Sequence, residues 1–187
     1  MVVWDEQRGS HVFLRNADLV FTNNTITYIG NGYDGQADIV IDGSQLCLIP
    51  GLIDIHAHPA SEVFYRGIRE DHSVRAHFMS GLFERSCAYR IAPDDLKNGA
   101  EVSYSDLLRS GVTTLVDNVF PYPGWTDIME RSGLRLYGAP GFNSSTWYRD
   151  NGHELKYRDH PEKGYADFRR ALEIVDELES HPNGRLR

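Results

Sequence analysis

The stretch IPGLIDIHAHPASE, residues 49–62, places two histidines two positions apart at the end of an apolar run that follows Pro-Gly. On an extended strand, side chains at positions i and i+2 point to the same face. His56 and His58 are therefore expected to lie close enough to share one ion. The same alternation predicts Asp54 on their face and the intervening apolar side chains on the other face, against helices.

Ionisable groups that share one buried face are costly unless something pairs them. A divalent cation at the carboxyl end of the strand would satisfy both imidazoles, with Asp54 one pleat deeper in a supporting role. Taken alone, a His-x-His at a strand end more often consists of ordinary polar residues. Its position here favours a metal site, because α/β barrels build their sites at the carboxyl ends of strands.

The composition excludes several classes of function. Hydrophobic residues make up 41% and charged residues 25% of the 187, as in globular proteins. A net charge of −8 argues against a nucleic-acid partner. Cys47 and Cys87 give no disulfide framework, and no apolar run suits a signal or a membrane span. We expect a cytoplasmic protein with a small-molecule substrate and no membrane partner; a homo-oligomer stays open.

Residues 1–49 are predicted to form a small all-β piece. Segments 11–21, 25–30 and 37–43 are rich in β-branched and aromatic residues and are separated by turn residues.

From Pro50 onward the pattern alternates between strands and helices. This order predicts an α/β fold, in which helices cover a parallel sheet. The expected strands are 51–58, 112–119 and 134–142, and the expected helices are 92–111, 125–133 and 162–182.

The predicted helices show start, stop and core signals. Pro93 fits the first turn of the helix over 92–111, Gly111 fits its end, and Gly133 fits the end of the short helix over 125–133. Helical spacing predicts one buried face in each of the two long helices: Leu96, Ala100, Tyr104 and Leu107 in the first, and Tyr165, Phe168, Leu172 and Val175 in the last.

The segment PGLIDIHAH closely resembles the first barrel strand of the metal-dependent amidohydrolase superfamily. FYRGIRED (64–71), IAPDDLKNGAEVSYSDLLRSGVTTLVDN (91–118) and SGLRLYGAPGF (132–142) resemble segments of the branch that contains cyclic amidine deaminases and triazine hydrolases.

The resemblance implies an incomplete TIM-type (β/α)8 barrel preceded by part of a β-sandwich. Residues 1–49 would belong to the sandwich, and residues 50–187 would supply about three βα units. From Pro50 to Arg187 there are 138 residues (187 − 50 + 1), against about 250 for a full barrel. The ending HPNGRLR lies where a fourth strand would begin.

The resemblance also implies a chemistry. His56 and His58 match the first two ligands of one divalent metal, with zinc favoured over iron or nickel. The metal lowers the pKa of water, and the resulting nucleophile hydrolyses a C–N bond other than a peptide bond, as in deamination of a heterocycle or cyclic amidine. The other ligands and the acid and base come from later strands, beyond residue 187. Because catalytic zinc normally has three protein ligands, this chain alone is expected to be an inactive fragment.

Other polar residues near the strand ends are not expected to bind the metal. Glu62, in the loop over the site, is a candidate for substrate contact. Arg66 fits packing or an anionic substrate group. His72 and His77 are expected on the surface, and Asp117, at the end of the second strand, is not expected to be catalytic.

Two other functions stay open. A dinuclear amidohydrolase that opens cyclic amides would need a carboxylated lysine on the fourth strand. A non-catalytic half-barrel would need a partner chain to complete it.

Overall fold

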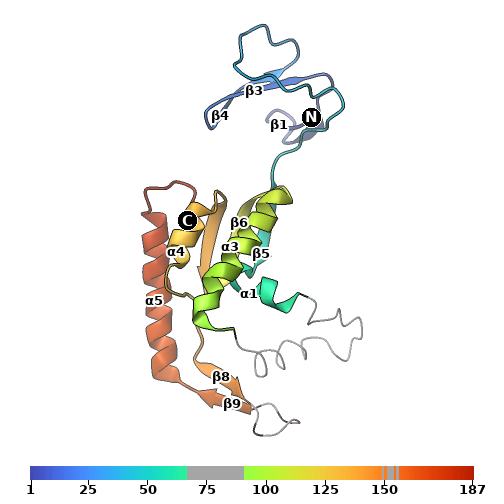
Figure 1. Cartoon of the computed structure of the whole chain (residues 1–187). Helices are drawn as coiled ribbons and strands as arrows, with labels where there is room; N and C mark the ends of the chain where they lie inside the picture. Colours follow the sequence, from blue (N-terminus) through green and yellow to red (C-terminus); the bar gives the residue numbers. More distant parts are fainter. Residues whose placement is uncertain (67–90, 149, 151–153, 155) are drawn as a thin grey trace. The chain divides into compact units, whose positions relative to one another are not determined.

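The computed structural model describes residues 1–66, 91–148, 150, 154 and 156–187 (Figure 1). The chain divides into two compact units, Met1–Gly51 and Leu52–Arg187. The strands of the first unit form antiparallel hairpins, and the second unit contains parallel strands and helices. Among the described helices, none has the length and apolar character that crossing a membrane requires.

Two hairpins supply all the strands of the first unit. Strand β1 pairs with β2, and β3 pairs with β4. The predicted strand over residues 11–21 is broken in two, because Asn16 has a left-handed φ of +52° between β2 and β3. The bounds of β1 to β4 are Val2–Asp5, Ser10–Phe13, Asp18–Thr22 and Thr25–Gly30.

The predicted strand over residues 37–43 is wrong. This segment is irregular, and Ile39, Val40 and Ile41 are largely exposed. β-branched residues favour a strand only where a neighbouring strand supplies hydrogen bonds and packing. No strand of the first unit pairs with this segment. The assignment of residues 1–49 to a β-sandwich stays a prediction.

Three parallel strands form the sheet of the second unit, in the order β5-β6-β7. The predicted α/β fold with a parallel sheet is confirmed (Figure 1). The elements in chain order are β5 (Leu52–Ala57), α1 (Pro59–Glu62), the 3-10 helix η1 (Val63–Tyr65), α3 (Pro93–Arg109), β6 (Val112–Val119), α4 (Trp125–Arg131), β7 (Arg135–Pro140), β8 (Ser145–Tyr148), β9 (Lys156–Asp159) and α5 (Pro161–Glu179).

The last residues of the chain extend the sheet beyond β7. Leu186 forms a parallel bridge with Leu136 and is fully buried. The Leu136 N–H donates to the Arg185 carbonyl at 2.8 Å, and the Gly138 N–H donates to the Arg187 carbonyl at 2.8 Å. A single parallel bridge therefore lies where a fourth strand is expected, and the fourth barrel strand itself stays a prediction.

The helix boundary signals are also confirmed. Pro93 opens α3, with Asp94 and Asp95 in the first turn, where carboxylates interact favourably with the helix dipole. Gly111 and Gly133 follow α3 and α4 with φ angles of +88° and +83°. Glycine adopts this left-handed conformation without steric cost, so each helix ends where its glycine predicts.

The hydrophobic core lies between the sheet and the helices. Leu115 of β6 and Leu136 of β7 are fully buried in one cluster with residues from α3, α4 and α5. The predicted face of α3 is confirmed, because Ala100 and Tyr104 are buried in this cluster and Leu96 and Leu107 pack against it.

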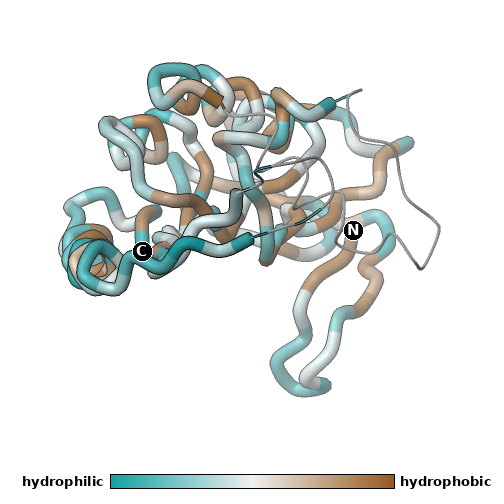
Figure 2. The backbone as a smooth tube through the Cα atoms, turned by 90° about the horizontal axis from the view of Figure 1, so that it is seen from below, coloured by the Kyte–Doolittle hydropathy of each residue, from teal (hydrophilic) through white to brown (hydrophobic). Residues whose placement is uncertain are grey.

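The predicted face of α5 is wrong, because large side chains at that spacing turn outward. Tyr165 and Leu172 are exposed, and the Phe168 side chain is 37% exposed. The buried residues are Gly164, Ala171, Ile174 and Leu178. A Cβ atom on Gly164 would lie 2.5 Å from the Ser144 Cβ atom, so α5 approaches residue 144 too closely for any side chain at position 164. Figure 2 shows α5 end-on, with hydrophilic and hydrophobic segments around it.

A hairpin of β8 and β9 follows β7 and was not predicted. The two strands pair antiparallel, and the Trp147 and Tyr157 rings lie 6.4 Å apart, edge to face. The hairpin leaves the same end of the sheet as α1 (Figure 1). Loops at the carboxyl ends of parallel strands are where α/β proteins place their sites.

Helix α3 packs directly on α1, and a glycine makes the contact possible. A Cβ atom on Gly99 would lie 2.5 Å from the Ala60 carbonyl oxygen and 2.6 Å from the Phe64 ring. Because the nearest atom belongs to the backbone, no side-chain rotation can relieve this clash. The position of α1, and so of the end of β5, depends on this close approach.

We expect Gly99→Ala to destabilise the chain by about 1–3 kcal/mol, the usual cost of overpacking, although alanine favours helices over glycine by about 1 kcal/mol. Thermal unfolding of the variant measures this. Ser105→Ala, at an exposed position of the same helix, is the control and should change stability little. A higher unfolding midpoint for Gly99→Ala than for the unmodified chain would contradict the close contact between α1 and α3.

Candidate metal site

The carboxyl end of β5 turns sharply into α1, and this turn places the two histidines. Strand β5 ends at Ala57, and His58 is the N-cap of α1 with φ −125° and ψ 63°. Pro59 occupies the first helical turn, where its fixed φ suits a helix start and its missing N–H is not needed. The sequence His-Pro therefore ends the strand at the second histidine, as the motif predicted.

A register shift in β5 separates Asp54 from the histidines. Asp54 pairs with Leu115 and Ala57 with Asp117, so three steps along β5 match two along β6. Leu115 and Asp117 are fully buried and face the helices. Paired neighbours point to the same face of a sheet, so Asp54 and Ala57 also face the helices.

The predicted simple alternation is therefore interrupted by this bulge-like irregularity, although Asp54, His56 and His58 still border one cavity. The Asp54 side chain accepts a hydrogen bond from the His56 backbone N–H at 3.0 Å, which stabilises the shifted strand. Ile53 and Ile55, predicted to contact helices, are instead 68% and 76% exposed.

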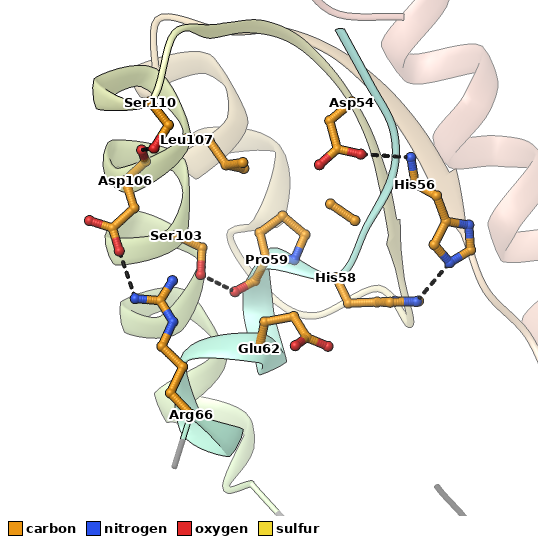
Figure 3. A pocket seen from close by; sticks show the side chains of 11 residues that line it. Asp54, His56, His58, Pro59, Glu62, Arg66, Ser103, Asp106, Leu107 and Ser110 are labelled. Atoms are coloured by element: carbon orange, nitrogen blue, oxygen red, sulfur yellow. Dashed lines mark hydrogen bonds and ion pairs between the residues drawn. The ribbon is translucent and has the colours of Figure 1, made fainter. Parts of the chain in front are cut away.

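The two imidazole rings meet at the tip of β5. The His56 Nε2 and His58 Nε2 atoms lie 3.1 Å apart, and the ring planes are 81° apart (Figure 3). Two ring nitrogens at this distance need either a proton between them or a cation that both lone pairs face. The predicted convergence of the two side chains is observed.

A backbone carbonyl orients the His58 ring. The His58 Nδ1 atom lies 2.6 Å from the carbonyl oxygen of Asn118, near the end of β6. A carbonyl oxygen only accepts hydrogen bonds, so Nδ1 carries a proton, and in the neutral form of the ring the lone pair lies on Nε2. Histidines that bind metals commonly donate their second ring N–H in this way.

The donor set fits part of a metal site. Imidazole is a good ligand for zinc, iron and nickel, and the Nε2 atoms of His56 and His58 converge from one strand tip. No group of three or more His, Cys, Asp or Glu side chains among the described residues is arranged to hold a metal. Catalytic zinc normally has three protein ligands, so a complete site of that kind would need one from outside the part of the chain that the structure describes.

A cavity lies between β5, α1 and α3, and both histidines border it (Figure 3). Its volume is about 370 Å³, and its walls include His56, His58, Asp54, Glu62 and Ser103. Glu62 is exposed at the end of α1, so the structure leaves its predicted substrate contact untested. Arg66 forms an ion pair with Asp106 at 2.7 Å, which gives it a packing role between η1 and α3.

Helix α3 also holds the turn after His58. The buried Ser103 hydroxyl donates to the Pro59 carbonyl at 2.8 Å. Together with the close contact at Gly99, this bond fixes the start of α1 against α3. The sequence offered no distinct signal for Ser103, because a serine in a helix usually faces solvent.

A buried carboxylate lies beside the site, at the end of β6. Asp117 is fully buried, and its Oδ2 atom accepts hydrogen bonds from the Tyr104 hydroxyl at 2.5 Å and the Trp125 Nε1–H at 2.7 Å. Burial raises the pKa of Asp117, and the two hydrogen bonds oppose that rise. Burial, followed by the charge of Asp117, raises the pKa of Tyr104.

Three of the remaining histidines have other local roles. His11 stacks edge to face on Trp4, His160 contacts the Thr146 hydroxyl, and the His181 Nδ1 atom accepts the Asn183 N–H. His72, His77 and His153 lie outside the described residues, so the predicted surface position of His72 and His77 is not addressed.

The buried hydroxyl of Tyr104 predicts a loss of stability at alkaline pH. Above about pH 10 the unfolded chain releases this proton while the folded chain keeps it. The stability that the protonated Tyr104 hydroxyl contributes is therefore fully present below about pH 10 and decreases as the pH rises further. Tyr104→Phe removes the titration, so the stability difference between parent and variant should shift by about 1.4 kcal/mol from pH 9 to pH 11.

Chemical unfolding at several pH values measures this difference. Tyr157→Phe, which changes an exposed ring, is the control. A difference between the parent chain and Tyr104→Phe that stays constant from pH 9 to pH 11 would show that the hydroxyl is not buried in solution.

No known family model matches the sequence. It is 27% identical over 152 residues to a 5-methylthioadenosine/S-adenosylhomocysteine deaminase of Haloarcula marismortui, covering 81% of this chain and 32% of the relative. It is 27% identical over 174 residues to a 5'-deoxyadenosine deaminase of Methanosarcina barkeri, covering 93% and 37%. The chain thus spans about a third of the length of these curated relatives.

The fold is similar to that of a solved structure, atrazine chlorohydrolase TrzN from Arthrobacter aurescens complexed with zinc. The TM-score is 0.59 at 19% identity, over 98% of this chain and 43% of TrzN. At this identity the likeness concerns the fold alone. Together, the deaminase relatives and this fold confirm the resemblance predicted from PGLIDIHAH: the chain is similar to the N-terminal portion of metal-dependent amidohydrolases, in the branch of the deaminases and triazine hydrolases.

Proposed function

We propose that this chain is the first part of a metal-dependent hydrolase barrel, and that His56 and His58 are two ligands of one divalent cation, zinc in first place. The observation that carries the proposal is the pair of facing Nε2 atoms at 3.1 Å, with the His58 Nδ1 proton held by the Asn118 carbonyl. The zinc bound by TrzN, whose fold is similar, supports zinc as the metal.

The described residues have defined tasks in such a site. His56 and His58 would hold the zinc, which would supply Lewis acidity and lower the pKa of water, so that hydroxide is available near neutral pH. The Asn118 carbonyl keeps the proton on Nδ1 and so presents the Nε2 lone pair of His58. Asp54 holds the His56 backbone, and Ser103 holds the turn at Pro59, so both rings are oriented from fixed backbone.

We propose hydrolytic deamination of a heterocycle as the reaction, because both sequence relatives named above are deaminases of adenine nucleosides. Hydrolysis of that kind replaces an exocyclic amino group on an sp² carbon by oxygen. Glu62 follows His58 by four residues and borders the cavity, which supports a contact with the substrate. The sheet β5-β6-β7 would then be the start of a (β/α)8 barrel, and the third ligand and the acid and base would come from outside the described residues.

The metal proposal is tested by titrating the 187-residue chain with Zn²⁺ and following the imidazole resonances of His56 and His58 by NMR. We expect both sets of resonances to shift together and to saturate. Either His56→Ala or His58→Ala should remove saturable binding at this site, because one imidazole alone does not retain zinc. His11→Ala, in the first unit, is the matched control and should leave the titration unchanged.

The incompleteness of the site is tested in the same samples. With only two ligands in place, the zinc-loaded chain should release no ammonia from 5'-deoxyadenosine. Zinc that shifts neither ring, or that binds equally well to the two alanine variants, would refute the metal site. Ammonia release by this chain alone would refute the need for a further ligand.

A further inference from the structure

Burial of the Asp117 carboxylate destabilises the folded state, so its presence at this position needs an explanation. Its Oδ2 atom has two donors, but its Oδ1 atom has no hydrogen-bond partner among the described residues. The nearby buried hydroxyl of Tyr122 also lacks a partner there. Burying a charged group with incomplete hydrogen bonding costs more than an apolar side chain of similar size would.

The position of Asp117 connects it to the histidine pair. Strand β5 pairs with β6 only as far as Ala57 opposite Asp117. The next carbonyl along β6, that of Asn118, therefore lies beyond the end of β5. The His58 Nδ1–H fills this place at 2.6 Å, where a neighbouring strand would otherwise supply an N–H.

Two helices that pack on the sheet hold the Asp117 side chain in place. The Tyr104 hydroxyl comes from α3 and the Trp125 indole from α4, so one carboxylate oxygen joins both helices to the end of β6. Both partners are themselves almost fully buried. A displacement of this strand end would move the Asn118 carbonyl and weaken its bond to His58.

We propose that Asp117 is a positioning residue for His58. The clamp by Tyr104 and Trp125 fixes the end of β6, and the Asn118 carbonyl at that end keeps the His58 ring in its Nδ1-protonated form. Asp117 acts through the backbone and does not touch the cation or the substrate. The role of His58 as a ligand rests on the proposed function, but its tautomer and orientation do not.

The experiment compares Asp117→Ala with Asp117→Asn in the 187-residue chain. An asparagine oxygen can accept the same two hydrogen bonds, so it preserves the clamp and removes only the charge. The first readout is the ¹⁵N shift of the two His58 ring nitrogens at pH 8 without metal. The second readout is the dissociation constant for Zn²⁺. Asp127→Asn, at an exposed position of α4, is the matched control.

We expect Asp117→Ala to lose the preference for the Nδ1-protonated ring and to bind Zn²⁺ about tenfold more weakly, the usual effect of losing a group that supports a ligand. Asp117→Asn should restore both readouts to within about twofold of the parent chain. A folded Asp117→Ala chain with the parent tautomer would show that Asp117 is merely structural, which overturns the proposal. An Asp117→Asn chain as defective as Asp117→Ala would overturn it in favour of a charge effect.

If Asp117→Ala does not fold, Tyr104→Phe and Trp125→Phe carry the test, since each removes one donor of the clamp. Both should shift the His58 tautomer in the same direction by a smaller amount, and unchanged His58 signals in both would overturn the proposal. A parent chain that binds no Zn²⁺, but whose His58 tautomer responds to these variants, would refute the metal site and leave the positioning role standing.

Discussion

The hydrogen bond between the His58 ring and the Asn118 carbonyl is the interaction on which the candidate site depends. It joins the end of β5 to the end of β6, and so ties the strand that carries His56 to a strand of the buried core. Without it, His58 would be a ring at an exposed strand tip. With it, one ring nitrogen is committed to the protein and the other is left to face His56.

The bulge in β5 lets one short strand serve two faces of the sheet. Regular alternation would have pointed the Asp54 side chain in the same direction as the two rings. The extra residue turns Asp54 toward the helices, where its carboxylate accepts a hydrogen bond from the His56 backbone N–H. One short strand therefore presents two imidazoles and uses its carboxylate to hold its own backbone.

Much of this arrangement could be predicted from local sequence. Pro93, Gly111 and Gly133 mark helix ends because their conformational limits act within a single turn. The convergence of His56 and His58 follows from their spacing of two, although His58 lies just past the strand, at the N-cap of α1. The errors concern longer-range effects. The bulge depends on register with β6, the face of α5 depends on how closely it approaches Ser144, and segment 37–43 lacks the neighbouring strand that its composition anticipates. The clamp on Asp117 joins α3 to α4, and no pattern within one element predicts it.

The fixed His58 ring has a thermodynamic consequence. A side chain that is free before binding loses rotational entropy when it takes up a ligand, at a cost of about 0.5–1.5 kcal/mol. The His58 ring is already immobilised by the Asn118 carbonyl, so its rotational entropy is lost when the chain folds and not when a ligand binds. In the proposed metal site, preorganisation of this one ring would strengthen ion affinity by about two- to tenfold.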